Sequence, residues 1–87
     1  MMAESSNEVP HALATLEHIV KSVVENPDQV QVDVTVEDDT VSMSVTVGDG
    51  DMGRVIGRRG RIANAIRTVV QAAAVRDGIP VAVEFVD

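Results

Sequence analysis

The sequence contains no cysteine, tryptophan or tyrosine, and Phe85 is its one aromatic residue. Without cysteine, a disulfide framework, thiolate catalysis and a zinc site built on sulfur are excluded. Without Trp and Tyr, stacking of bases on aromatic side chains is excluded beyond Phe85. No apolar run exceeds four residues, whereas a helix that spans a bilayer needs about 20. Residues 1–10 also lack the basic and apolar regions of a signal peptide. We therefore expect a cytoplasmic protein without a membrane segment.

Charge of one sign dominates the chain, which has 14 acidic residues, 7 basic residues and a net charge of −7. Taken as an average, this charge disfavours a partner made of phosphates. The charges are segregated, however: residues 1–51 carry −10, residues 52–76 carry six Arg and no acid, and residues 77–87 carry −3. This pattern indicates a local anion site on an acidic body, or else a basic helix face paired with neighbouring acids.

Composition and periodicity predict a disordered tail over residues 1–10 and one domain over residues 11–87. A helix is expected from Pro10 to the Asn26-Pro27 step, because apolar residues recur at helical spacing and Pro27 disfavours helical backbone before it. The apolar positions of this helix are Leu13, Leu16, Val20, Val23 and Val24.

Two histidines, His11 and His18, fall on this helix. Their separation is about 10.5 Å along the helix axis, which is too far for a shared metal ion without other ligands. We therefore expect surface histidines, and no metal or cofactor.

Strict alternation of apolar and polar residues then predicts two strands joined by a turn at Asp38-Asp39. Their apolar positions are Val30, Val32, Val34 and Val36 in the first strand and Val41, Met43, Val45 and Val47 in the second. Asp51 is a candidate N-cap for a short helix over Met52–Ile56.

A longer helix is expected after Gly60, and Gly78 ends it. A third strand alternates through Val81, Val83 and Phe85. The element order is therefore α-β-β-α-α-β, which predicts a two-layer α+β fold with a three-stranded sheet covered by helices. The apolar stripe expected on the long helix is Ile62, Ile66, Val69, Val70 and Ala73.

The segment Gly48–Gly53 formally matches the GxGxxG pattern of dinucleotide-binding folds. That fold also needs a βαβ unit and an acid about 20 residues later on a strand, and neither is expected here. Asp49 and Asp51 would moreover repel a pyrophosphate. A calcium loop starting at Asp49 would need Glu at its twelfth position, which is Gly60. We interpret this segment as a loop.

A second glycine pattern, Gly57-Arg58-Arg59-Gly60, lies between the two predicted helical segments. Glycines at both ends allow positive φ and let a sugar-phosphate chain approach the backbone closely. The following helix presents free N–H groups and the positive end of its dipole to an anion. Arg61 adds a further cation at the same place. This combination is typical of a site for a phosphodiester backbone.

The segment GRVIGRRGRIANAIRTVVQAAA resembles the core of a KH domain, whose hallmark is VIGxxGxxI. Val55, Ile56, Gly57 and Gly60 match this motif, whereas its final Ile is replaced by Ala63. The element order is that of a type II KH domain. Over residues 11–87 the chain resembles the small stand-alone bacterial KH proteins of the KhpA family.

The resemblance implies single-stranded RNA binding, with about four nucleotides clamped on the GxxG loop and bases read along an apolar groove. Groove candidates include Val55 and Ile66, although helical periodicity requires some of the apolar positions to be core. Arg54 and Arg67 either extend a positive rim around the GxxG loop or are ordinary exposed charges on a helix. The RNA-binding residues implied are Met52, Arg54, Ile56, Gly57, Arg58, Arg59, Gly60, Arg61 and Ile62.

The resemblance also implies a larger KH-bearing partner protein, a possible homodimer, and a role as an RNA chaperone or post-transcriptional regulator. The alternative is a KH-fold module for protein interaction or ribosome association with little RNA binding of its own. An enzyme is not expected, because no nucleophile–histidine–acid set converges on the loop and no GxxxxGK[ST] motif occurs.

Overall fold

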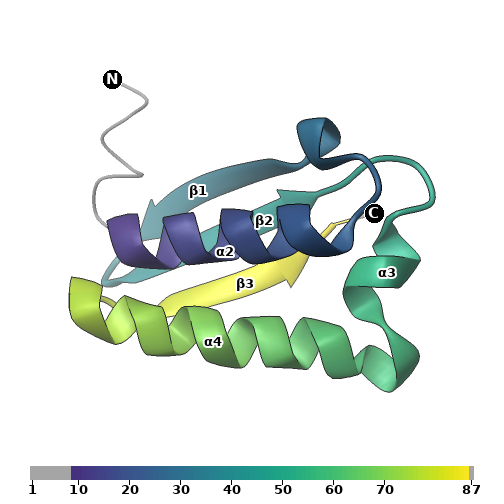
Figure 1. The fold of residues 1–87 in the computed structure, drawn as a ribbon. Helices are drawn as coiled ribbons and strands as arrows, with labels where there is room; N and C mark the ends of the chain where they lie inside the picture. The colour runs from purple at the N-terminus through teal and green to yellow at the C-terminus, as the bar shows by residue number, and fades with distance from the viewer. Residues whose placement is uncertain (1–8, 87) are drawn as a thin grey trace.

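The computed structural model describes residues 9–86 and has the α+β architecture and the element order that the sequence predicts (Figure 1). Two single turns of 3₁₀ helix, η1 and η2, interrupt the connections. The elements are α2 (Pro10–Val23), η1 (Pro27–Gln29), β1 (Gln31–Glu37), β2 (Thr40–Thr46), α3 (Met52–Ile56), η2 (Arg58–Gly60), α4 (Arg61–Asp77) and β3 (Val81–Phe85).

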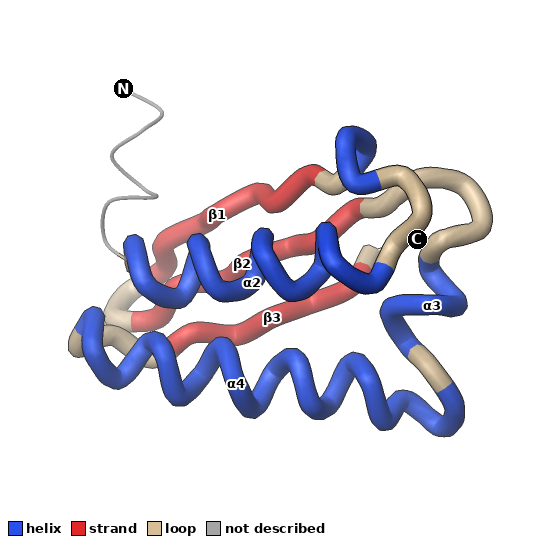
Figure 2. The backbone as a smooth tube through the Cα atoms, viewed as in Figure 1, coloured by secondary structure: helices blue, strands red, loops and turns tan. Residues whose placement is uncertain are grey.

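The sheet has three strands in the order β1-β2-β3. β1 and β2 form the predicted antiparallel hairpin, in which Val34 is opposite Met43. β3 lies parallel to β2, with Val83 beside Met43, so the chain crosses over through α3 and α4 before it returns to the sheet. Helices α2 and α4 form one layer and the strands form the other (Figure 2).

The core lies between these two layers. The alternating residues of β2 point inward, and Val41, Met43 and Val45 are fully buried. Helix α2 contributes Leu16 and Val20, as its predicted stripe requires, while Leu13, Val23 and Val24 pack at the margin of the core. Val9 is also fully buried and Pro10 opens α2, so the fold begins no later than Val9. The rest of the predicted tail, residues 1–8, lies outside the described residues.

The predicted apolar stripe of α4 is confirmed at Ile66 and Val70 but was wrong at Ile62 and Val69. The structure buries Ala63, Ile66, Val70 and Ala74, whereas Ile62 is 39% exposed and Val69 is 47% exposed. Two small residues, Ala63 and Ala74, thus lie on the buried face of the helix. Two of the largest aliphatic side chains of α4 are therefore left at the surface.

The N-terminus of α2 is capped by a residue that is distant in sequence. Its N-cap residue, Val9, has no side-chain hydrogen bond to offer. Instead the buried carboxylate of Asp77, at the end of α4, accepts hydrogen bonds from the backbone N–H groups of His11 and Ala12. The ring nitrogen Nδ1 of His11 lies 2.7 Å from the same carboxylate. Burial alone would raise the pKa of Asp77, but these donors outweigh it and lower the pKa.

Both histidines are exposed, as predicted. Within residues 9–86 no group of three or more His, Asp or Glu side chains is arranged to hold a metal ion. In the same part of the chain no helix has the length and apolarity needed to cross a membrane.

Candidate nucleic-acid interface

The GxxG segment forms one tight turn that joins α3 to α4. Gly57 has φ 69° and ψ −173°, a conformation that only glycine adopts readily. Arg59 and Gly60 both have left-handed backbone, with φ of 55° and 72°. Positive φ at these three positions bends the chain sharply between α3 and α4. Arg58 and Arg59, both exposed, form the tip of this turn.

The two glycines of the turn serve different purposes. A Cβ atom on Gly57 would lie 2.6 Å from Cγ1 of Ile62 and 2.9 Å from its Cβ, so the turn packs directly against that side chain. A Cβ atom on Gly60 would meet nothing within 4 Å. Gly57 is therefore required for folding of the turn, whereas Gly60 leaves bare backbone beside open space.

Three arginines surround the tip of this turn. Arg58, Arg59 and Arg61 are all exposed, and the ion pairs formed within residues 9–86 involve none of them. They stand at the N-terminus of α4, a helix of 17 residues whose dipole adds positive potential there. For these three residues the structure favours an anion site over the alternative of a basic face paired with acids.

Arg54, by contrast, is paired with neighbouring acidic residues. Its Nη2 atom lies 3.1 Å from the Glu25 carboxylate, and its Nε atom lies 3.6 Å from the Asp51 carboxylate. The guanidinium is thus directed toward the loop that follows α2, and two acidic residues partly neutralise it.

Asp51 is the N-cap residue of α3, which has the predicted bounds, but its side chain makes no capping hydrogen bond to that helix. Its buried carboxylate accepts hydrogen bonds from the backbone N–H groups of Glu25 and Asn26, both at 3.1 Å, and from the Asn26 side chain. These donors are free because α2 ends at Val23, three residues earlier than the Asn26-Pro27 step that was predicted. Asp51 therefore ties the start of α3, and with it the GxxG turn, to the end of α2.

Because of these contacts, Asp51→Asn is expected to lower the free energy of unfolding at neutral pH. Burial would raise the pKa of Asp51, but the N–H of Glu25, the donors of Asn26 and the charge of Arg54 outweigh it and lower the pKa. A lowered pKa means that the stabilisation is complete at neutral pH and is lost as the pH falls below about 4. Urea unfolding at pH 7 and pH 3 checks this: the difference between wild type and variant should shrink at pH 3. An equal difference at both pH values would contradict it.

The apolar residues predicted for the RNA-binding groove divide between the core and the surface. Val55 is fully buried and Ile66 is 3% exposed, so both belong to the core. Ile56 and Ile62, on either side of the turn, are 38% and 39% exposed, and Met52 is half-buried.

Ala63, where the KH motif has Ile, is buried. Its difference from the motif therefore changes the core rather than the exposed surface beside the turn.

A cavity of about 280 Å³ opens beside the turn, between α2 and α4. It contains one cation, Arg61, and otherwise exposes aliphatic side chains. Its lining residues are Ile19, Arg61, Ile62, Ala65, Ile66 and Val69.

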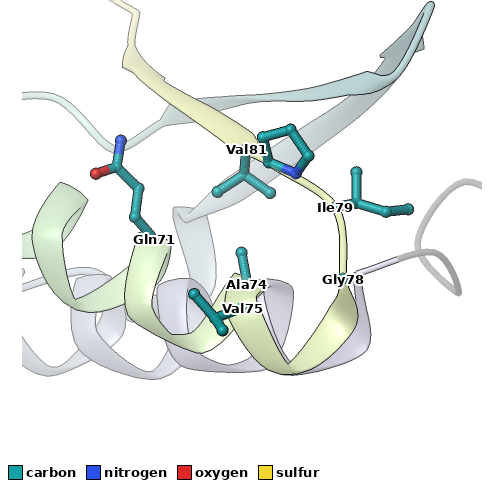
Figure 3. Close-up of a pocket in the computed structure, with 7 residues that line it drawn as sticks. Gln71, Ala74, Val75, Gly78, Ile79 and Val81 are labelled. Carbon is teal, nitrogen blue, oxygen red and sulfur yellow. The ribbon is translucent and has the colours of Figure 1, made fainter.

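A larger cavity, of about 510 Å³, lies at the other end of α4 (Figure 3). Gln71, Ala74 and Val75 line it from the helix, and Ile79 and Val81 line it from the chain that leads into β3. No charged side chain is among its lining residues. This cavity therefore has nothing to hold a phosphate, and we do not include it in the interface.

Asn64 and Phe85 were not among the predicted site residues, yet both contact the guanidinium of Arg67. For Arg67 the sequence left open a positive rim or an ordinary helix charge. The three-residue spacing of Asn64 and Arg67 on one helix could have indicated their contact. The contact with Phe85 depends on how β3 packs beside α4.

Known proteins are similar to this chain in sequence over most of its length. The family model described as "KhpA/KhpB, KH domain" matches residues 14–85. The chain belongs to the KhpA/KhpB family of KH domains. Its relatives include the RNA-binding protein KhpA of Clostridium acetobutylicum, which is 48% identical over 71 residues, or 82% of this chain and 95% of that protein.

Two further relatives also match most of the chain. The RNA-binding protein KhpA of Borreliella burgdorferi is 38% identical over 86 residues, which are 99% of this chain and the whole of that protein. The RNA-binding protein KhpA of Leifsonia xyli subsp. xyli is 46% identical over 72 residues, or 83% of this chain and 92% of that protein. The turn, the cations and the exposed aliphatic residues thus lie on a KH domain of type II order.

Proposed function

We propose that this KH domain binds single-stranded RNA through the turn at Gly57–Gly60. The observation that carries the proposal is the tip of the turn, where Arg58, Arg59 and Arg61 are exposed and unpaired within residues 9–86. Bare backbone at Gly60 and the N-terminus of α4 support close approach of a phosphate at the same place. The naming of several relatives as RNA-binding proteins is consistent with this function.

The bases would contact aliphatic side chains rather than aromatic ones. Ile56 and Ile62 flank the turn and are exposed enough to touch base faces, and Met52 extends this surface. Arg54 would contribute less than the other cations, because Glu25 and Asp51 already pair with it. We assign no catalytic step to this site and place its action in the cytoplasm, as an RNA chaperone or post-transcriptional regulator.

Salt dependence of binding tests the proposed contacts. Two to four phosphate contacts, at about 0.7 each for single strands, predict a slope of log K against log salt of roughly −1.5 to −3. Fluorescence anisotropy of a labelled eight-nucleotide RNA between 25 and 300 mM KCl would measure this slope. A slope near zero, or no binding at the lowest salt, would contradict RNA binding at this turn.

A partner protein with a KH domain forms the second part of the proposal. Ile62 and Val69 expose aliphatic surface around the cavity between α2 and α4, and surface of this kind favours contact with another protein or a second copy. This surface also supports the alternative function, a KH-fold interaction or ribosome-associated module. The two readings differ in whether the arginines of the turn are needed for RNA binding.

A further inference from the structure

Arg67 is held more firmly than any arginine of the turn. Its Nε–H donates a hydrogen bond to the backbone oxygen of Val83 at 3.1 Å, and its Nη1 donates to Oδ1 of Asn64 at 3.0 Å. The guanidinium carbon also lies 5.3 Å from the centroid of the Phe85 ring. A planar cation fixed at two nitrogens and one face cannot rotate freely, so its remaining donors point in set directions.

These contacts place Arg67 at the free edge of the sheet. β3 has a neighbouring strand on one side only, β2. The backbone bonds Val41 N–H to Pro80 O and Val86 N–H to Val45 O show that alternate residues of β3 face β2. In a parallel ladder, successive residues direct their backbone groups to opposite sides of the strand. Val83 is three positions from both Pro80 and Val86, so its backbone groups point away from β2, toward the free edge.

The same edge lies close to the turn. Arg67 follows Arg61 by six residues on α4, which is about 9 Å along the helix axis. β3 runs toward the end of the molecule that holds α3, so Phe85 at its C-terminus is on the side of the turn (Figure 1). A strand of about four nucleotides clamped on the turn extends far enough to reach this position.

Three of the five N–H groups of the Arg67 guanidinium have no hydrogen-bond partner among residues 9–86. They are donors only and lie in one plane, so they match a base edge that offers two adjacent acceptors. Guanine offers O6 and N7, and cytosine offers O2 and N3. Adenine offers N7 beside an amino donor, and uracil separates its two acceptors by an N–H.

We propose that Arg67 reads one base of the bound RNA and selects guanine or cytosine over adenine and uracil. Asn64 acts as the positioning residue that aligns the guanidinium. This inference rests on the proposed function, since it assigns base selectivity to the RNA that the turn binds.

The test compares four RNA octamers: octauridine, and octauridine with one central G, C or A. Wild type is expected to bind the G or the C octamer about fivefold or more tightly than the A octamer and octauridine. Measuring G and C separately decides which base is read. Arg67→Lys keeps the charge but loses the planar fork, so the preference should fall below about twofold while the affinity for octauridine changes little.

Each other outcome overturns a defined statement. If wild type binds all four octamers equally, base selection is wrong and the proposed function stands. If it binds none of them, the proposed function fails and the inference fails with it. If Arg67→Lys weakens all octamers equally, Arg67 has a structural role only. Asn64→Ala provides a second variant should Arg67→Lys fail to fold, as thermal melting would show; an unchanged preference in Asn64→Ala would then overturn the inference.

Discussion

Replacing Arg58 by Gln and Arg59 by Asn is expected to weaken RNA binding about 25-fold at 0.1 M salt. Each lost phosphate contact removes about 0.7 from the salt slope, which at 0.1 M corresponds to a factor of about five. Asn suits position 59 because that residue has φ 55°, and Asn tolerates left-handed backbone. Anisotropy with labelled octauridine at several KCl concentrations would show both the weaker binding and a slope that is shallower by about 1.4.

The matched control is Arg76→Glu, which changes the net charge by the same two units in the last turn of α4. If the long-range charge of the protein governed RNA binding, this control would weaken it as much as the double variant. We expect a loss well under threefold, because exposed charges separated by more than about 10 Å are largely screened at 0.1 M salt.

The same double variant separates the two functional readings. If crosslinking to cellular RNA recovered equal RNA with the folded double variant and with wild type, the turn would not be the RNA site. The alternative function, a KH-fold interaction or ribosome-associated module, would then explain the data better. If the variant also failed to pull down the KH-bearing partner, RNA binding and partner binding would share the turn. Retention of the partner with loss of RNA would assign the partner to the Ile62–Val69 surface instead.

Gly57→Ala is expected to lower the free energy of unfolding by about 3 kcal/mol. The backbone angles of Gly57 are φ 69° and ψ −173°. For a residue with a side chain, this conformation costs roughly 1–3 kcal/mol. Its Cβ atom would also come within 2.9 Å of three atoms of the Ile62 side chain, and overpacking of this kind costs a further ~1–3 kcal/mol. Urea unfolding followed by circular dichroism would measure the loss, which is a large part of the stability of a small domain.

Gly60→Asn is the matched variant for Gly57→Ala. Position 60 has φ 72° and ψ 14°, which Asn tolerates, and a Cβ atom there meets nothing within 4 Å. We expect a stability loss of about 1 kcal/mol or less together with weaker RNA binding, because the side chain obstructs the approach of the sugar-phosphate chain. Equal destabilisation by the two substitutions would contradict the different roles assigned to these glycines.

Much of the fold could be predicted from local patterns. The alternation through Val41, Met43 and Val45 predicted a strand with one buried face, because the side-chain period of a strand is two residues. Gly78 ends α4 with φ 76°, as its sequence position indicated. The bounds of α3 also matched the prediction.

The buried face of α4 could be predicted only in part, at Ile66 and Val70. Ile62 and Val69 are as apolar as the residues that are buried, and helical spacing allows either set to face the core. The structure instead buries Ala63 and Ala74, because the rotation of the helix about its axis depends on the packing of the whole core.

The order of the elements, the cluster of arginines and the two glycines that flank it could all be predicted from the chain. These features are local, since periodicity, turn chemistry and charge depend on residues close together in the chain. Which arginines are paired, and which aliphatic residues stay exposed, depends instead on tertiary contacts. Asp51 binds the end of α2 and Arg54 pairs with Glu25, although each contact joins residues more than 20 positions apart. Such long-range contacts depend on how the helices and sheet pack together, so they leave no signature in the spacing of residues.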